Sequence, residues 1–468
     1  MSRSMLSLAT LLLVGAVAVA PLDAQSAAPT FARLAAPLAA QPAPSAPPAS
    51  QPGSLRLTLE DATARAVEQS HRLAEARARQ QAATANIEVR KTSDDPTLTV
   101  SAGYTRTNHI DEFGVPQPNG QLRVIYPDIP DNYRTRLELM WPIYTGGRTN
   151  ALARAAEAEA TATGKDLAAV RLDLRLEVAR AYWALVTARD TVRVLEQSLA
   201  TADHSLTDVR TRVEAGFLPP NDVSRSEAQR ARSELLLIEA RGRVEAVTID
   251  LARLIGAPDV PVIEPADALE GPAATSSDAS ALITEALAQR PELAAITERG
   301  NGITARLDGI AATRKPTVAF VSGYDWANPN PRIFPRTARW EDSYDLTLNV
   351  SWQFWDSGRA KADRAEALFN QSALTERQRE VETQIKADVR KALVDVSTSR
   401  AALAPARLAV TAAQETRRVV NDRFEAGVAT TLDVLDAQLS EMQAELDRAR
   451  VLADIRLAEA RLTRVVGR

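Results

Sequence analysis

A long stretch of the chain places its apolar residues at alternating intervals of three and four. Between residues 150 and 214 there is no proline, and the apolar positions follow one seam. The seam consists of Leu167, Val170, Leu174, Val178, Ala181, Leu185, Ala188, Val192, Leu195, Leu199, Ala202, Leu206, Val209 and Val213. This spacing is typical of coiled-coil packing, and about 65 helical residues form a rod of roughly 100 Å. A second such stretch covers 360–424 and contains Pro405, where we expect a kink.

Glycines mark the ends of both rods. Gly216 and Gly427 stand where a helix C-terminus is expected, and a further helical stretch follows each of them. We therefore expect helical hairpins at 150–256 and 359–467, each with the sequence Glu-Ala-Gly at its tip. Shorter helical stretches are predicted at 58–91 and 278–314.

Four shorter segments alternate apolar and polar residues with a period of two. They lie at about 97–107, 133–143, 317–326 and 343–355. In the last of them Leu346, Leu348 and Val350 alternate with polar side chains. Ten-residue strands with one apolar and one polar face are typical of membrane β-barrels, although a soluble hairpin can show the same alternation.

The aromatic residues favour the membrane interpretation. The chain is only 4% aromatic, yet 15 of its 21 aromatic residues lie within 97–144 and 317–355. Rings near strand ends suit a bilayer interface. The candidates for that role are Trp141, Tyr144, Trp352 and Trp355. Four strands are too few to close a barrel, so we expect several copies to share one, and three copies give twelve strands.

The chain is also an imperfect tandem repeat. Arg-Val-Glu-Ala-Gly at 212–216 recurs as Arg-Phe-Glu-Ala-Gly at 423–427, an offset of 211 residues. Upstream the offset is 220, as between Gly103 and Gly323, so the second copy is shorter. Two similar units of this length are expected to pack side by side.

These patterns divide the chain into five parts. An apolar run from Leu6 to Ala20 follows Arg3, which is typical of a secretory signal peptide. The parts are a signal peptide at 1–24, a disordered Ala/Pro-rich leader at 25–54, a first repeat at 55–256, a linker at 257–277 and a second repeat at 278–468. The segment 106–132, rich in Pro, Asp and Asn, is expected to be an exposed turn. The predicted fold class is mainly α with a membrane β-barrel portion.

Composition argues against several classes of function. Lys plus Arg (56) nearly balances Asp plus Glu (60), so no net field favours nucleic acid. The chain has no cysteine and three scattered histidines, so we expect no metal centre. It has no phosphate-binding loop, nucleophile elbow or nucleotide fingerprint. We expect neither enzymatic activity nor a cofactor.

With these elements in place, the chain resembles the TolC-like outer-membrane efflux proteins over 57–467. The most specific segment is Arg-Phe-Glu-Ala-Gly-Val-Ala-Thr-Thr-Leu-Asp-Val-Leu-Asp-Ala at 423–437. The resemblance implies a homotrimer in the lipid of the Gram-negative outer membrane, with a twelve-stranded barrel continued by a coiled-coil helical tunnel in the periplasm. It implies a passive exit duct for small molecules or proteins. A periplasmic adaptor (membrane fusion protein) and an energised inner-membrane pump of the RND, ABC or MFS type would be its partners.

The strand-to-helix junctions at 141–148 and 352–359 also look like those of the family. Gly146, Gly147 and Gly358 are expected to permit the sharp backbone turn from barrel to helix.

The resemblance implies a constriction of the periplasmic mouth by Asp433 and Asp436. Residues three apart share a helix face, so three copies would place six carboxylates round one ring that attracts cations. The alternative is that Asp433 is a first-turn aspartate favoured by the helix dipole. Asp222 matches Asp433 in the first repeat and joins the candidates, although Arg225 stands where Asp436 would be expected.

This chain departs from the best-known family member at the mouth. A tyrosine and an arginine that tie the closed mouth there correspond to Phe424 and Ala429. Neither side chain can form those bonds, so we expect a looser or different closure.

The hairpin tips are the second candidate site, because the family meets its adaptor there. The candidate residues are Arg212, Glu214, Gly216, Arg423, Glu425 and Gly427. Helix termination alone accounts for the glycines, but it does not account for an arginine and a glutamate in both copies.

A different class of function remains open on the sequence. A secreted periplasmic helical-hairpin adaptor or structural scaffold, without a membrane barrel, would account for the rods, the charge balance and the signal. It would not account for four amphipathic strands that carry most of the aromatic residues. Cell fractionation separates the two, since a barrel needs detergent for extraction.

Overall fold

The computed structural model describes residues 55–260, 262–270 and 278–468. The predicted signal peptide and leader, and parts of the predicted linker, lie outside these residues. The described elements belong to one compact unit, Pro52–Arg468. Within the described ranges, no helix combines the length and the apolar content that crossing a bilayer requires.

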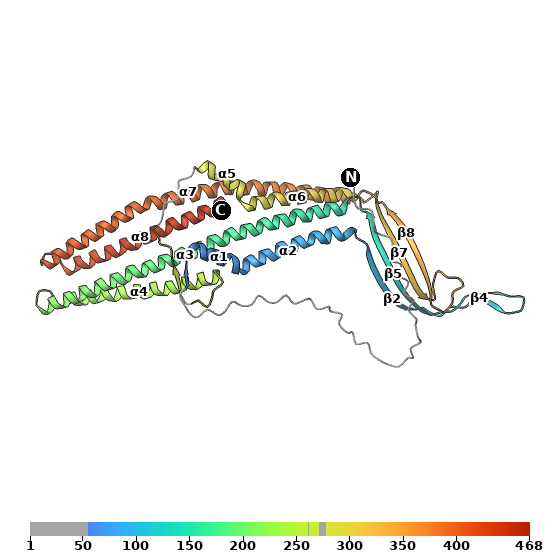
Figure 1. Ribbon diagram of the computed structural model, residues 1–468, viewed down its shortest axis with the longest axis horizontal. Helices are drawn as coiled ribbons and strands as arrows, with labels where there is room; N and C mark the ends of the chain where they lie inside the picture. The colour runs from blue at the N-terminus through green and yellow to red at the C-terminus, as the bar shows by residue number, and fades with distance from the viewer. Residues whose placement is uncertain (1–54, 261, 271–277) are drawn as a thin grey trace, which may run out of the picture. The chain divides into compact units, whose positions relative to one another are not determined.

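Two long helical hairpins make up about half of the described chain (Figure 1). Helix α3 (Arg148–Glu214) and helix α7 (Arg359–Glu425) each have 67 residues. They return through α4 (Asn221–Leu254) and α8 (Thr431–Val466), and α3 also packs against α8. Pro405 lies inside α7 without ending it.

The apolar seam of α3 forms much of the contact between these helices. Its fully or nearly buried members include Leu174, Val178, Leu185, Ala188, Leu195, Ala202, Leu206 and Val209. Burial of a seam with this spacing accounts for a helix of such length, because the energy comes from packing rather than from local propensity.

The shorter helices are more divided than the sequence predicted. Each predicted stretch forms two helices: α1 (Leu59–Gln69), α2 (His71–Lys91), α5 (Ala279–Gln289) and α6 (Pro291–Ala312). The breaks fall at Ser70 and Arg290, which have extended backbones. The Ser70 side chain caps α2 by accepting from the N–H of Leu73, and Pro291 disfavours a helical conformation for Arg290.

Four antiparallel strands form one sheet, in the order β2-β5-β7-β8 (Figure 1). They are β2 (Thr97–Arg106), β5 (Asp131–Tyr144), β7 (Thr317–Asn328) and β8 (Glu341–Ser351). The two hairpins have equivalent registers, because Ser101 opposes Arg136 and Val321 opposes Thr347. Strands β2 and β8 form the edges, and no described strand pairs with their outer sides.

One face of this sheet is apolar and exposed. Leu98, Val100, Leu346, Leu348 and Val350 are each between 63% and 68% exposed. Alternation places threonine, serine and charged side chains on the opposite face. An apolar face of this kind in water would be an aggregation site, so it requires a covering.

Strand β8 is shorter than the predicted 343–355. It ends at Ser351, which pairs with Thr317, the first residue of β7, so the following residues have no strand to pair with. Trp352 instead donates from Nε1 to the carbonyl oxygen of Arg314, at 3.0 Å. Phe354 and Trp355 are exposed beyond the strand.

Two small sheets were not predicted. The segment 106–132 is not a simple turn, because it contains a hairpin of β3 (Phe113–Pro116) and β4 (Leu122–Tyr126). Within the predicted linker, β6 (Ile263–Pro265) pairs in parallel with β1 (Leu55–Leu57). Strands of three to five residues are too short to give a recognisable period.

The largest core cluster lies where β1 and β6 pack against α3 and α4. Tyr182 is completely buried there, with its hydroxyl 2.8 Å from Asp267 Oδ2. Burial raises the pKa of Tyr182 to about 12, so the hydroxyl remains protonated and donates to that carboxylate.

Candidate functional site

Both hairpin tips end in a glycine with left-handed backbone. Gly216 has φ +80° and Gly427 has φ +74°, and a Cβ added to either would meet nothing within 4 Å. The next residues, Phe217 and Val428, are 80% and 66% exposed. Sequence reasoning missed this exposed apolar pair, although both residues directly follow the glycine of the repeated motif.

Arg212 joins the two tips. Its guanidinium lies 4.6 Å from the centre of the Phe424 ring, and Nη1 donates to the Phe424 carbonyl oxygen at 3.1 Å. Phe424 is buried with Val209 and Val434. Arg212 was predicted at the docking surface, but these contacts engage it between the hairpins. Its counterpart Arg423 is exposed, as are Glu214 and Glu425.

A buried hydrogen bond makes a second connection between the tips. Thr431 Oγ1 donates to Asp222 Oδ2 at 2.8 Å, and both residues are buried. Asp222 was predicted to share the constriction, whereas its carboxylate here lies between α4 and α8. Thr431 was missed because the two residues are 209 positions apart in the sequence.

Asp433 and Asp436 are both exposed at the start of α8. Asp433 forms a capping box with Thr430: its Oδ2 accepts from the backbone N–H at 2.8 Å and from the hydroxyl at 2.7 Å. These hydrogen bonds hold the pKa of Asp433 below its usual range. The carboxylate is therefore ionised and exposed, and its orientation is fixed by the hydrogen bonds from Thr430 at the start of α8.

The strand-to-helix junctions use left-handed backbone at equivalent places. Gly147 and Gly358 both have φ +88°, and each directly precedes a long helix. The preceding positions are Gly146, with φ +68°, and Ser357, with φ +52°. The second junction therefore uses a serine where the first uses glycine.

Aromatic side chains occupy both ends of the strands. Trp141 and Tyr144 are exposed near the end of β5 that leads to α3, and Trp352 and Trp355 are exposed just past β8. A second group at the opposite end was not predicted as a unit. There the ring centres of Tyr104 and Tyr133, of Tyr133 and Trp340, and of Trp326 and Trp340 are 5.1, 6.0 and 4.7 Å apart.

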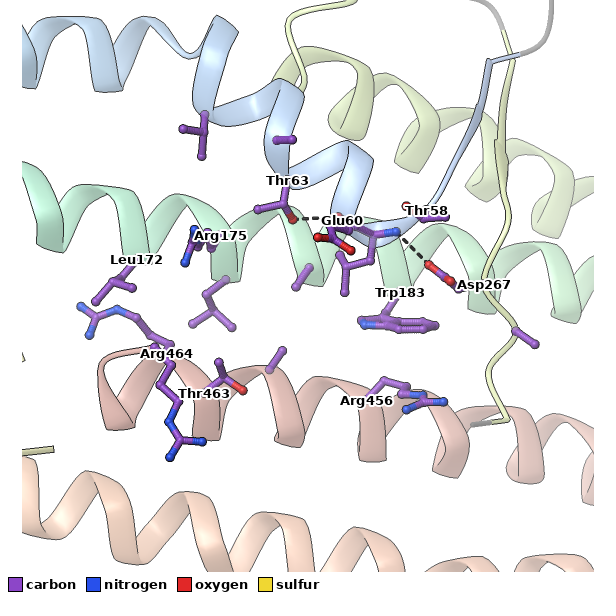
Figure 2. A pocket seen from close by; sticks show the side chains of 18 of the residues that line it. Thr58, Glu60, Thr63, Leu172, Arg175, Trp183, Asp267, Arg456, Thr463 and Arg464 are labelled. Atoms are coloured by element: carbon purple, nitrogen blue, oxygen red, sulfur yellow. Dashed lines mark hydrogen bonds between the residues drawn. The ribbon is translucent and has the colours of Figure 1, made fainter. Parts of the chain in front are cut away.

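A cavity of about 1030 Å³ lies between α1, α3 and α8 (Figure 2). Asp267 accepts from the backbone N–H of Leu59 at 2.8 Å, which fixes the start of α1. The Arg456 guanidinium lies 5.3 Å from the centre of the Trp183 ring, and its Nε donates to the Leu269 carbonyl oxygen.

Another arginine of the cavity is also held by the chain itself. Arg464 donates from Nε to Asp173 at 2.7 Å and from Nη2 to Glu292 at 2.6 Å. The charged side chains around the cavity thus hold α1, α3, α6 and α8 together. Among the described residues, no group of three or more His, Asp or Glu is placed to hold a metal ion.

The comparisons with known proteins agree with this architecture. The sequence profile of the family described as Outer membrane efflux protein matches residues 63–257 and 282–468. Protein CyaE of Bordetella pertussis is 25% identical over 95% of this chain and 90% of its own length. Pyoverdine export outer membrane protein OpmQ of Pseudomonas aeruginosa is 27% identical over 78% of this chain and 76% of its own.

Solved structures show the same fold. The CmeC outer membrane channel of Campylobacter jejuni superposes with a TM-score of 0.73 at 15% identity, covering 87% of this chain and 85% of that one. The outer membrane protein VceC of Vibrio cholerae gives 0.70 at 18% identity, covering 87% and 96%. The chain therefore belongs to the outer membrane efflux protein family, whose members are TolC-like channels that span the bacterial outer membrane and the periplasm.

Proposed function

We propose that three copies of this chain form a passive exit duct, with a twelve-stranded barrel continued by a tunnel of the long helices. The observation that carries the proposal is the sheet. It has two edges without a partner among the described strands and one exposed apolar face. Pairing β8 of one copy with β2 of the next would satisfy both edges, and lipid would cover the apolar face.

The aromatic groups at the two strand ends support this arrangement. Trp141 and Tyr144 would lie at one bilayer interface, and Tyr133 and Trp340 at the other. The polar face of the sheet would then line the lumen.

The hairpin tips would form the periplasmic mouth. Asp433 and Asp436 of three copies would make a ring of six carboxylates that attracts cations. The hydrogen bonds from Arg212 to Phe424 and from Thr431 to Asp222 would hold the two tips of one copy together and so keep the mouth closed. These contacts would take the place of the tyrosine and arginine bonds that the chain lacks.

An adaptor would dock at the same tips. Gly216 and Gly427 leave open space beside the exposed side chains of Phe217 and Val428. A partner helix can approach glycine closely and bury these apolar groups. The adaptor would connect the duct to an inner-membrane pump of the RND, ABC or MFS type, which supplies the energy.

The cargo would be chosen at the pump, and we infer that it is a small molecule or a protein. The relatives' names point to different cargoes: one is a pyoverdine export protein and another, from Cupriavidus metallidurans, is a cobalt-zinc-cadmium resistance protein. Similar ducts would therefore serve different pumps. Mild crosslinking in cells, followed by purification of the chain, should capture the pump and so define the cargo class.

Extraction and conductance test the duct itself. The protein should resist salt washing of membranes, require detergent, migrate as a trimer and conduct ions across a planar bilayer. The alternative scaffold should wash off with salt, remain monomeric in plain buffer and give no conductance. That second set of results would overturn the proposal.

A further inference from the structure

An ion-pair cluster crosses three strands on the polar face of the sheet. Arg136 of β5 donates from Nη1 to Asp325 of β7 at 2.6 Å and lies 3.2 Å from Asp345 of β8. Its Nε donates to Glu138 at 2.9 Å. One guanidinium therefore binds carboxylates on all three strands.

A glycine makes this reach possible. Gly323 of β7 lies between Glu138 and Asp345 in the strand register. A Cβ built at Gly323 would lie 2.5 Å from Cζ and 2.7 Å from Nη1 of Arg136, closer than real contacts allow. Any larger residue at this position would displace the guanidinium from its partners.

The cluster contains equal numbers of positive and negative groups. Arg134 pairs with Asp325 at 2.6 Å. Arg332, in the loop between β7 and β8, pairs with Asp345 at 2.8 Å. The cluster thus joins three arginines to three carboxylates. The Asp325 side chain is only 4% exposed, so its charge depends on these partners rather than on water.

We propose that this cluster keeps the lumen electrically neutral at its level, because Asp325 and Asp345 offset arginines that would otherwise make this level selective for anions. The inference rests on the proposed function, because it requires the polar face to line the lumen. Arginines that lose a carboxylate partner in a narrow lumen attract anions, whereas the balanced cluster favours neither sign. Cargo of either charge would then pass this level of the barrel.

The tandem repeat supplies a matched control. Gly103 corresponds to Gly323, but the residue that corresponds to Arg136 is Thr347. A Cβ at Gly103 would meet nothing within 4 Å among the described residues. Gly103→Ala should therefore leave the dissociation temperature of the trimer unchanged, whereas Gly323→Ala should lower it.

Reversal potentials in a salt gradient test the proposal, with purified protein in planar bilayers and KCl as the only salt. Asp345→Asn should raise the chloride-to-potassium permeability ratio at least about twofold, as expected for an uncompensated ring of arginines. Arg136→Met should lower the ratio, and the double variant should return to the wild-type value. Absence of channels in the wild type would contradict the proposed function, whereas conducting variants with unchanged ratios would overturn only the neutral cluster.

A second measurement tests the Arg136–Asp345 contact in trimers whose charges are all retained. Gly323→Ala keeps every charge but separates Arg136 from Asp345, so its trimer should dissociate at a lower temperature in SDS than that of Gly103→Ala. Equal dissociation temperatures for the two alanine variants would show that Gly323 does not hold Arg136 against its carboxylates, and would overturn the cluster on which the proposal rests.

Discussion

The two hairpin tips have nearly the same sequence and different chemistry. In the first, Asp222 is buried and accepts a hydrogen bond from Thr431 of the other tip. In the second, the corresponding Asp433 is exposed and caps its own helix. The difference follows from the N-cap residue of each helix. Pro220 precedes α4 and provides no side-chain cap, whereas Thr430 precedes α8 and forms a capping box with Asp433.

The paired arginines and apolar positions differ in the same way. Arg212 contacts the Phe424 ring, but Arg423 is exposed, and the residue of the first repeat that corresponds to Phe424 is Val213, which has no ring. A repeated motif therefore does not imply a repeated role. The first tip supplies groups that hold the tips together, and the second presents its charges to solvent.

The largest expected effect concerns docking, where we propose that the two tips act alike. Gly427→Leu should abolish export while trimers still assemble, because the new side chain would occupy the space open to the adaptor. Left-handed backbone also costs a non-glycine residue roughly 1–2 kcal/mol. Drug or metabolite export from cells measures the loss.

Two further glycine variants sharpen that result. Gly216→Leu makes the same change at the first tip, and an equal loss would indicate symmetrical docking. Gly242→Leu is the control, because Gly242 is exposed within α4 with nothing within 4 Å of an added Cβ. Unimpaired export by Gly427→Leu would contradict the docking proposal.

The next effect concerns closure, where the tips are expected to differ. Asp222→Ala removes the acceptor of the buried Thr431 hydroxyl, a loss of about 1–3 kcal/mol. Single-channel conductance in a planar bilayer should rise as the tips separate. Asp433→Ala should not raise it, and equal changes in the two variants would show that the buried bond does not hold the mouth.

The acidic ring should produce a smaller, pH-dependent effect. Asp433→Ala combined with Asp436→Ala should abolish block of the conductance by divalent cations. In the unmodified protein, block should weaken as the pH falls and the ring carboxylates become protonated. The hydrogen bonds from Thr430, which hold the pKa of Asp433 below its usual range, favour retention of that charge as the pH falls.

The contribution of the Asp433 cap to folding stability should also decrease as the pH falls. A carboxyl whose pKa is lowered on folding stabilises the folded state above its unfolded pKa, and this contribution disappears as the pH falls.

Conductance titrations with calcium at several pH values test the ring. Unchanged block in the double variant would contradict it.

The smallest effect concerns the junctions. Ser357→Gly should stabilise the protein by less than about 1 kcal/mol, since relief of left-handed strain is partly offset by the entropy of the unfolded glycine. Gly146→Ala should destabilise it, because its Cβ would lie 2.9 Å from Lys315 Cβ and 3.0 Å from the Ala312 carbonyl oxygen. Thermal unfolding followed by circular dichroism measures the change in melting temperature of each variant. Changes of the same sign and size would contradict the expected difference between the two junctions.

The long elements were predictable from the sequence because each repeats one pattern many times. The seam of α3 and the alternation in β7 identify a helix and a strand without reference to the rest of the fold. The end of β8 was not predictable, since Trp352 continues the alternation and only the absence of a partner strand stops the ladder.

The contacts at the tips were less predictable for a related reason. The sequence identified Asp222 and Arg212 as repeated residues, but not their partners Thr431 and Phe424 on the other hairpin. Contacts between distant segments depend on how the helices are packed. The Arg136 cluster was missed on the same grounds, because Gly323 is significant only beside a neighbouring strand's arginine.

The repeat predicts how separate copies of the chain would pair. Inside one chain β5 pairs with β7 so that Arg136 opposes Asp325. In the repeat, Arg136 corresponds to Thr347 at the offset of 211, and Asp325 corresponds to Thr105 at the offset of 220. The equivalent pair between copies is therefore Thr347 of one copy and Thr105 of the next. Because the chain has no cysteine, engineered cysteines at these two positions have no competing thiol.

Oxidative crosslinking of Thr105→Cys with Thr347→Cys in membranes tests the shared barrel most directly. We expect crosslinked dimers and trimers on non-reducing gels and no larger species. Little product should form when Leu346→Cys replaces Thr347→Cys, because residue 346 points to the opposite face of the strand. Monomers alone, or a ladder that continues beyond three copies, would contradict it.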